Sequence, residues 1–470
     1  MGKINVVVLH ALRDDSRQTT VNHALCFSRY FHASEVTYVN IFGVIPKLSK
    51  FDLVVVTYEL VALRNLPIWK LLVRRMAPIL EAARFRIAMP QDDYSRCDVL
   101  DDFIVEQKFD AVFTPITRDL EQLYPRAVRA GIQFHEAFTG YFELSDWSRL
   151  ESFSRPFRDR SIDVGQRVRH LPPQLGRAAG IKGQLAIDFG DAAKGQGFVC
   201  DVSTRSEDVL LGDDWWRFLG NMKFTVSRRG GASMADPTGR LADRVRRYQM
   251  RHPDASMAEI AKKVSMKGGR IGDFSAISPR LFEAAALGVC QILEPDDYVD
   301  GFLPGVHYIP IESNFSNVDQ VFEMMRDLDQ CEEIVNASQD LLLKSGNFTY
   351  EAFVKQLSSI ANVEQKIGTP SSFSDSSEDL DGIIGGESSN LRWVQDYVRR
   401  AFIKGRLSKC VQNLEQGKLL VLGAQDELMK SWAESESECL LRWLTAFRSR
   451  HLMVESLVIP WRTATSLADV

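Results

Sequence analysis

The stretch that decides the fold is Ser278-Pro279-Arg280-Leu281-Phe282-Glu283-Ala284-Ala285-Ala286-Leu287-Gly288-Val289-Cys290-Gln291. Ser278 is a favourable N-cap residue, and Pro279 suits the first turn of a helix. The run of alanines favours helix, and Gly288 is typical of a helix C-terminus. Residues 289–293 then predict a short buried strand. We therefore expect a short helix that leads directly into a strand.

Two charged side chains of this helix have the right spacing to act together. Arg280 and Glu283 are three residues apart and share one side of the first turn, which we expect to be exposed. A helix N-terminus that carries a guanidinium and a carboxylate can bind phosphate and sugar hydroxyls together. The sequence thus predicts a ligand site at Ser278, Arg280 and Glu283. The alternative is a surface ion pair on a packed helix.

The same stretch resembles the signature helix in the C-terminal domain of GT-B glycosyltransferases, in the group-1-like and spore-maturation-like branch. Several further segments resemble that branch, namely 295–298, 307–311, 316–319, 325–327 and 347–351. The resemblance covers about residues 195–360. It implies that Glu283 binds the nucleotide ribose. The family's earlier glutamate, eight residues before, is Ser275 in this chain.

Composition limits the function classes. The 470 residues allow about two to four domains, with 45% hydrophobic and 25% charged residues. A net charge of -5 argues against a dedicated nucleic-acid binder. The seven cysteines are scattered, without a CxxC pair, which argues against a disulfide framework or a metal site. No signal peptide or membrane span is evident, so we expect a cytoplasmic protein.

Short apolar runs alternate with helical segments in the first third of the chain. We predict strands at 4–9, 36–41, 52–58, 86–89 and 111–114, with a helix at 63–83. Such alternation indicates βαβ units and a parallel sheet. The sequence therefore predicts a Rossmann-like acceptor domain over residues 1–145.

The pattern resumes after an Arg- and Pro-containing interdomain segment, 146–195, in which 176–189 is an expected helix. We predict further strands at 197–202, 223–227 and 289–293, and helices at 213–219, 239–250, 256–264, 317–329, 332–344 and 349–362. These define a second Rossmann-like domain, 196–366, for the nucleotide-sugar. The expected fold class is α/β, with two Rossmann-like domains that face each other across a cleft (GT-B) and a C-terminal helical extension.

The last hundred residues lie outside the resemblance. Residues 367–390 are rich in Ser, Gly and acidic residues, which predicts a flexible linker. Residues 391–470 contain two amphipathic patterns, at 391–408 and 425–447, which predict a helical tail. This tail completes the fold, forms a homo-oligomer, or contacts a partner that carries the acceptor.

A glycine-containing segment follows the predicted strand 223–227. Arg228 supplies charge, while Gly230 and Gly231 let the backbone approach a phosphate and Ser233 adds a hydroxyl. The family has a similar Gly-rich segment, so we predict donor binding here. A plain loop is the equally weighted alternative. His307 and Tyr308 are further candidates for donor binding, because the branch often has the same pair.

The predicted strand ends of the first domain carry candidates for catalysis. A carboxylate or imidazole there can take a proton from the acceptor hydroxyl, as an inverting transfer requires. His10, Asp92 and Asp93 are the candidates, and each can instead be a loop cap or a satisfied polar residue. Adjacent aspartates lack a spaced D-x-D pattern, and neither a P-loop nor a dinucleotide fingerprint is present.

Taken together, the resemblance implies a metal-independent glycosyltransferase without a bound cofactor. Its donor would be a nucleotide-diphosphate-sugar, and its acceptor a hydroxyl of a polysaccharide, glycolipid or protein glycan. Two alternatives stay open: an inactive GT-B-like binding or scaffold protein, and a nucleotide-sugar epimerase or hydrolase. Peripheral membrane contact is compatible with the sequence, and nucleic acid is not an expected partner.

Overall fold

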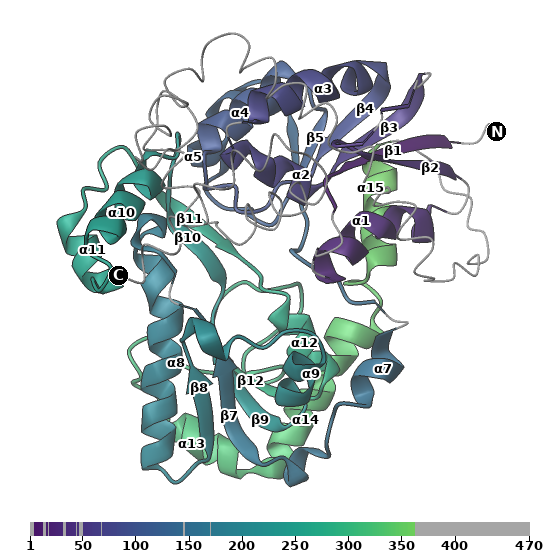
Figure 1. Cartoon of the computed structure of the whole chain (residues 1–470). Coiled ribbons are helices and arrows are strands. Elements are labelled where there is room, and N and C mark those ends of the chain that lie inside the picture. Colours follow the sequence, from purple (N-terminus) through teal and green to yellow (C-terminus); the bar gives the residue numbers. More distant parts are fainter. Residues whose placement is uncertain are drawn as a thin grey trace, which may run out of the picture. The chain divides into compact units, whose positions relative to one another are not determined.

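A computed structural model describes residues 4–361, apart from 13–15, 17, 32–33, 44, 47–49, 67, 144–145 and 170 (Figure 1). The predicted linker 367–390 and the predicted tail 391–470, with its suggested role in assembly, lie outside the described residues. The described residues belong to two compact units. The larger unit contains both parallel sheets, and the smaller one contains residues 240–265.

The first sheet has six parallel strands in the order β2-β1-β3-β4-β5-β6. Their bounds are β1 Ile4–His10, β2 Ser34–Asn40, β3 Phe51–Val56, β4 Ala83–Ala88, β5 Ala111–Thr114 and β6 Gln133–Glu136. The five predicted strands are confirmed. The apolar runs of β1, β3 and β5 are buried as central parallel strands require, whereas β2 and the middle of β4 are largely half-buried. Strand β6 was not predicted, because its four residues are partly exposed and form no apolar run.

Helices cover this sheet on both faces. On one face lie α1 Gln18–Tyr30 and α15 Tyr350–Ile360, which share a core with the sheet through Phe27 and Phe353. On the other face lie α3 Trp69–Ala82 and α4 Cys97–Glu106, with the rings of Trp69 and Phe103 4.9 Å apart. Shorter helices are α2 Tyr58–Ala62, α5 Leu120–Leu123 and α6 Pro125–Arg129.

The position of α15 differs from the predicted domain boundaries. The sequence placed its residues in the second domain, 196–366. The buried stripe Tyr350, Phe353, Val354 and Leu357 instead packs in the core of the first sheet. An apolar stripe at helical spacing indicates that a helix is covered, but it does not indicate by which sheet.

The second sheet has five parallel strands in the order β13-β12-β9-β7-β8. Their bounds are β7 Ile162–Arg167, β8 Cys200–Ser203, β9 Met222–Ser227, β12 Cys290–Leu293 and β13 Ile309–Pro310. The associated helices are α7 Trp147–Glu151, α8 Arg177–Gly195, α9 Asp213–Leu219, α12 Arg280–Ala286, α13 Val318–Arg326 and α14 Leu328–Gln339. The predicted α/β class with two Rossmann-like sheets is confirmed.

The predicted interdomain segment 146–195 is not a connection between domains. It contains β7, which lies between β9 and β8 in the second sheet, and α8, which packs on β8 and β9. The strand was missed because its sequence, IDVGQR, carries polar or charged residues at three of six positions and has a glycine at a fourth. Its burial depends on neighbours that are distant in the sequence.

Both sheets have a topological switch point. In the first sheet the chain moves from β1 to β2 on one side and then to β3 on the other. In the second sheet it moves from β7 to β8 and then to β9 on the opposite side. Ligands of open α/β sheets bind at the carboxyl ends of the strands that flank such a point. The pairs β1/β3 and β7/β9 are therefore the two places to look for sites.

An antiparallel hairpin, β10 Gly230–Ala235 with β11 Arg270–Ala276, accompanies the second sheet. The smaller unit, between these strands in sequence, contains α10 Arg240–Arg251 and α11 Met257–Lys263, which confirms the two helices predicted there. Ser256 caps α11, because its Oγ accepts a hydrogen bond of 3.2 Å from Glu259 N. None of the described helices combines the length and the apolar character that a bilayer span needs.

Arg160 fixes the junction between α12 and β12. Its buried guanidinium donates to the carbonyl oxygens of Leu287 at 2.6 Å and Gly288 at 2.8 Å, which end α12. It also donates, at 2.9 Å, to the carbonyl oxygen of Met222, which is the first residue of β9. Bonds to Arg155 O and Ser154 Oγ use its remaining donors. Burial lowers the pKa of Arg160 to about 10, and the cation offsets the negative end of the helix dipole.

Arg160→Met is expected to lower the free energy of unfolding by about 3 kcal/mol, because several buried carbonyl oxygens lose their donor. Arg158→Met is the control: Arg158 lies two residues earlier and forms exposed pairs with Asp329 and Glu332. In denaturant unfolding, the free energy of unfolding of Arg158→Met should be close to that of the wild type. Equal losses for both variants would contradict the role given to Arg160.

Candidate functional site

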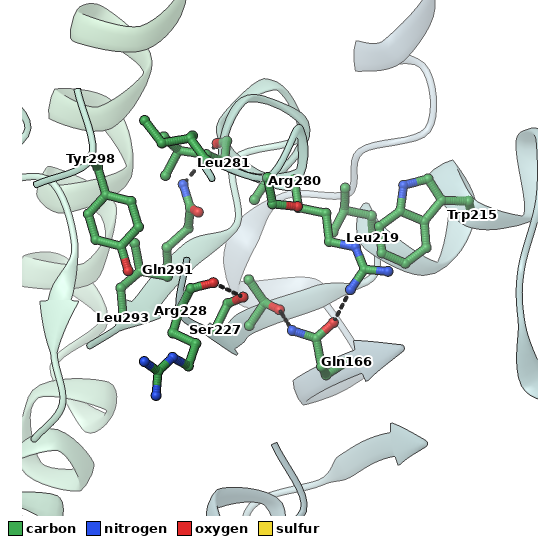
Figure 2. Close-up of a pocket in the computed structure, with 14 residues that line it drawn as sticks. Gln166, Trp215, Leu219, Ser227, Arg228, Arg280, Leu281, Gln291, Leu293 and Tyr298 are labelled. Atoms are coloured by element: carbon green, nitrogen blue, oxygen red, sulfur yellow. Dashed lines mark hydrogen bonds between the residues drawn. The ribbon is translucent and has the colours of Figure 1, made fainter. Parts of the chain in front are cut away.

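A pocket lies at the carboxyl ends of β7, β9 and β12, at the switch point of the second sheet (Figure 2). Helices α9 and α12 close its sides. The lining residues are Gln166, Trp215, Leu219, Thr225, Ser227, Arg228, Ile277, Ser278, Arg280, Leu281, Ala284, Gln291, Leu293 and Tyr298.

Arg280 lies in the wall of this pocket and is held by two neutral groups. Its Nη1 donates a hydrogen bond of 2.9 Å to Gln166 Oε1, and its guanidinium lies 5.0 Å from the centre of the Trp215 ring (Figure 2). Gln166 is fixed in turn, because its Nε2 donates to Val226 O at 2.6 Å. Burial lowers the pKa of Arg280, and the charge of Glu283 opposes that shift. The first turn of α12 is thus half-buried under α9, not exposed as predicted.

Glu283 lies beside the pocket but is not one of its lining residues. Its Oε2 accepts a hydrogen bond of 3.1 Å from Trp215 Nε1. Burial raises the pKa of Glu283, while the charge of Arg280 and the indole N–H oppose the shift. The two charged residues are not within ion-pair distance, so the alternative of a surface ion pair is not formed; the indole of Trp215 contacts both side chains instead.

Two more cations lie close to Arg280. Arg228 lines the pocket after β9, and its Nη1 lies 3.0 Å from Glu294 Oε2. Lys182 belongs to α8, and its Nζ would lie 3.8 Å from a Cβ added to Gly230. Burial, together with the charges of Arg280 and Arg228, lowers the pKa of Lys182 to about 7. Within the described residues Lys182 has no hydrogen-bond or ion-pair partner, so this cation lacks compensation.

The segment predicted as a phosphate-binding loop is the start of strand β10. Gly230 pairs with Ala276 and Gly231 with Ser275 in the hairpin. Gly231 has φ +110°, and a Cβ there would lie 2.3 Å from Phe274 O. Ser233 Oγ accepts a hydrogen bond of 3.1 Å from Ala178 N, at the start of α8. The glycines therefore serve the hairpin, and of this segment only Arg228 lines the pocket.

His307 and Tyr308 support the pocket without lining it. The ring of Tyr308 stacks on Phe302 at 5.1 Å and meets the ring of Tyr298 at 5.8 Å. His307 Nδ1 accepts a hydrogen bond of 2.9 Å from Leu303 N, and burial lowers the pKa of His307. Tyr298 is the member of this aromatic cluster that reaches the pocket.

Asp92 and Asp93 belong to a loop that follows β4. Asp93 is fully buried, and its Oδ2 accepts hydrogen bonds from the hydroxyls of Thr114 and Tyr124. Burial raises the pKa of Asp93. Asp92 is exposed, and its carbonyl oxygen accepts from Arg64 Nη2 at 2.8 Å. These contacts hold the loop together. They agree with the alternative stated for both residues, that of a loop cap or a satisfied polar residue.

His10 ends β1 and is fully buried. Its Nδ1 accepts a hydrogen bond of 3.2 Å from Leu12 N, which leaves the ring proton on Nε2. Burial lowers the pKa of His10 to about 4, so the ring is neutral near pH 7. In this tautomer Nε2 is a donor and cannot take a proton, contrary to the predicted role as a base.

The residues of the site that the sequence analysis missed include Lys182, Gln166, Trp215, Gln291 and Tyr298. Lys182 did carry a signal, because it precedes Leu185, Ala186 and Phe189 on the buried stripe of α8. A lysine at helical spacing on a buried stripe is unusual and suggests a function. Among the described residues no group of His, Cys, Asp and Glu has an arrangement that could hold a metal ion.

No protein-family model matches the chain, and no curated protein matches it. Solved structures do resemble it. HepE of Anabaena, in complex with UDP and glucose, is 11% identical, with 77% of this chain and 100% of that chain covered and a TM-score of 0.42. An α1,3-fucosyltransferase is 9% identical, with 77% and 91% covered and a TM-score of 0.38. A Listeria monocytogenes protein, provisionally assigned as a UDP-N-acetylglucosamine 2-epimerase, is 10% identical, with 78% and 99% covered and a TM-score of 0.36.

Gly231→Ala is expected to lower the free energy of unfolding by about 2 kcal/mol or more, because the new methyl group collides with Phe274 O at an unfavourable φ. Gly230→Ala is the matched control, since its Cβ would meet no atom closer than 3.8 Å. Thermal melts of the two variants check this expectation. A harmless Gly231→Ala would show that the hairpin does not need glycine there.

Proposed function

We propose that the chain is a glycosyltransferase that binds a nucleotide-diphosphate-sugar in the pocket of the second sheet. The observation that carries the proposal is that Arg228 and Arg280 both line the pocket at the carboxyl ends of β7 and β9, with Lys182 near them. Lys182 is not a lining residue, but the charges of both arginines act on its amine. These side chains come from three separate elements: α8, the loop after β9 and the start of α12. The fold therefore holds three like charges together before any ligand is present.

Like charges at close range destabilise each other, and the lowered pKa of Lys182 reflects that repulsion and its burial. Glu294 compensates Arg228, but Arg280 contacts only an amide and an indole ring, and Lys182 has no partner among the described residues. A diphosphate would supply the missing negative charge. The same cations would stabilise the nucleotide as the sugar–phosphate bond breaks and charge moves onto the leaving group.

The remaining pocket residues fit the other parts of such a donor. Ser278 and Gln291 offer hydrogen-bonding groups, and Trp215 and Tyr298 offer aromatic surfaces. Glu283 reaches ribose hydroxyls in the resembling family. Here it would do so by exchanging or sharing its bond to Trp215 Nε1. Because three side-chain cations supply the positive charge, we propose a transfer without a divalent metal ion, to a hydroxyl of a polysaccharide, glycolipid or protein glycan.

A binding protein that has lost transfer is the second candidate. It is favoured by Ser275, which takes the place of the family's earlier glutamate and whose Oγ accepts from Arg229 Nε at 3.2 Å. Such a protein would bind the nucleotide-sugar without releasing free nucleotide. An epimerase or hydrolase would convert the donor without an acceptor. Incubation with a panel of nucleotide-sugars, followed by product analysis, distinguishes these outcomes.

Lys182→Met is expected to weaken nucleotide-sugar binding about tenfold to a hundredfold, because one charge-assisted contact to phosphate is lost. Its melting temperature should stay the same or rise, since a buried cation is removed. Lys194→Met is the matched control on the same helix, where Lys194 is exposed and pairs with Asp191. Calorimetry with UDP, GDP, ADP and their glucose or mannose conjugates measures both. Unchanged binding by Lys182→Met would contradict the proposed site.

Binding should also depend on pH through Lys182. Its pKa of about 7 in the free protein should rise when a diphosphate binds, because the anion favours the charged amine. Affinity for a nucleotide-sugar, whose diphosphate diester does not titrate here, should be constant below that pKa and fall as the pH rises above it. Proton uptake on binding, measured at pH 8 in buffers of different ionisation heat, tests this. The uptake should vanish in Lys182→Met, and its persistence there would assign it to another group.

A further inference from the structure

The switch point of the first sheet carries polar groups that the site above does not use. His10 ends β1 and Glu59 follows β3, and these two strands are paired in the sheet (Figure 1). Glu59 Oε1 accepts a hydrogen bond of 3.4 Å from Ala11 N, next to His10 in the chain. The carboxyl group thus lies against the end of β1. Open α/β sheets bind ligands outside the carboxyl ends of the strands that flank such a switch point.

Two buried atoms at these strand ends lack a hydrogen-bond partner within the described part of the chain: His10 Nε2 and Glu59 Oε2. Because His10 Nδ1 accepts from Leu12 N, His10 Nε2 carries the ring proton and is a donor. Glu59 Oε2 is an acceptor whenever the carboxyl group is ionised. Buried polar groups are almost always paired, so an unpaired donor and an unpaired acceptor just beyond the ends of neighbouring strands require an explanation. A ligand hydroxyl can satisfy both, since it accepts one bond and donates another.

The hydroxyl group of Thr57 can form a hydrogen bond with Glu59 whether the carboxyl group is protonated or ionised. The hydroxyl oxygen of Thr57 lies 3.0 Å from Leu9 O and 2.5 Å from Glu59 Oε1, yet the hydroxyl has one proton. Both contacts are hydrogen bonds at the same time only when Glu59 carries a proton. When Glu59 is ionised, Thr57 can donate to it instead. The surroundings therefore accept the gain and loss of a proton at this carboxyl group.

We infer that the acceptor hydroxyl of the proposed transfer binds at the ends of β1 and β3, with His10 Nε2–H as donor and Glu59 as the group that takes the proton. This inference rests on the proposed function. As the acceptor oxygen bonds to C1 of the sugar, the C1–O bond to the diphosphate breaks. The electron pair leaves on the nucleotide, and the hydroxyl proton passes to the Glu59 carboxylate, which later returns it to water. A direct displacement of this kind inverts the configuration at C1.

The ionisation behaviour of Glu59 agrees with that role. Burial raises its pKa to about 7, against opposing hydrogen bonds from Thr57 and the backbone. The titratable neighbours described in this part of the sheet include His10 on β1 and Tyr58 on α2, whose hydroxyl is bonded to Thr20 Oγ1. Behind them lie Tyr38 on β2, 6.0 Å from the ring of His10, and His23 on α1, 5.5 Å from the ring of Tyr58. His10 is neutral near pH 7, so it adds no charge to the carboxyl group. A base whose pKa is near the working pH is effective in proton transfer.

The test compares Glu59→Gln with Glu81→Gln, an exposed carboxyl group on α3 as control. The probe is the nucleotide-sugar bound most tightly in the panel above, mixed with glucose, methyl glucosides, glycerol or water as acceptors. Glu59→Gln should release nucleotide at least a hundredfold more slowly, with donor affinity within twofold of the wild type and an inverted product. A rate within threefold of the wild type, or a product of retained configuration, would overturn the inference.

A second measurement does not depend on turnover. Infrared spectra of the wild type should show the carbonyl band of a protonated buried carboxyl group that disappears as the pH rises through about 7. Asp93 and Glu283 can add to the band, since burial raises the pKa of both. Glu59→Gln should therefore lack only the part of the band that disappears near pH 7, and Glu81→Gln should match the wild type. Absence of this band from the wild type would overturn the inference, since Glu59 could then not hold the acceptor's proton. Failure of the proposed function is a separate result: no nucleotide-sugar would bind to the wild type.

Discussion

The five hydrogen bonds of Arg160 are the constraint on which the candidate site depends. They join the end of α12 to the start of β9, so the helix cannot move along the sheet without leaving buried carbonyl oxygens unpaired. With its C-terminal end fixed, α12 presents Arg280 to the pocket at a defined height above β7 and β9. A residue outside the pocket thereby determines the geometry inside it.

Both sheets hold charged or polar groups that are poorly compensated in the free protein. The fold holds Lys182, Arg228 and Arg280 together at a cost in repulsion and desolvation, and compensates only Arg228 directly with a carboxylate. At the first sheet, His10 and Glu59 each have one buried polar atom without a partner among the described residues. Groups whose local environment is unfavourable in the free protein gather at functional sites, because a ligand can relieve the cost. Both sheets show this pattern at the same topological position.

The sequence predicted elements well where the local pattern is strong. Apolar runs identified the strands of the first sheet except β6, and Gly288, with φ +62°, follows α12 as expected. Prediction failed where tertiary contacts decide: β7 is polar, and Gly231 serves a hairpin rather than a phosphate. Of the candidate donor residues, Ser278, Arg228 and Arg280 line the pocket. Lys182 and Glu59 were missed, because the role of a single charged residue depends on which distant residues surround it, and the local sequence does not show these.

The placement of α15 has a consequence for protein engineering. Its apolar stripe belongs to the core of the first sheet, although the helix follows the whole of the second sheet in the chain. A hybrid protein made by joining the two halves of related enzymes at one junction would therefore bring a foreign helix against Phe27 and its neighbours. Exchange of donor specificity between such enzymes would need two junctions, with the segment from α15 onward kept from the parent that supplies the first sheet.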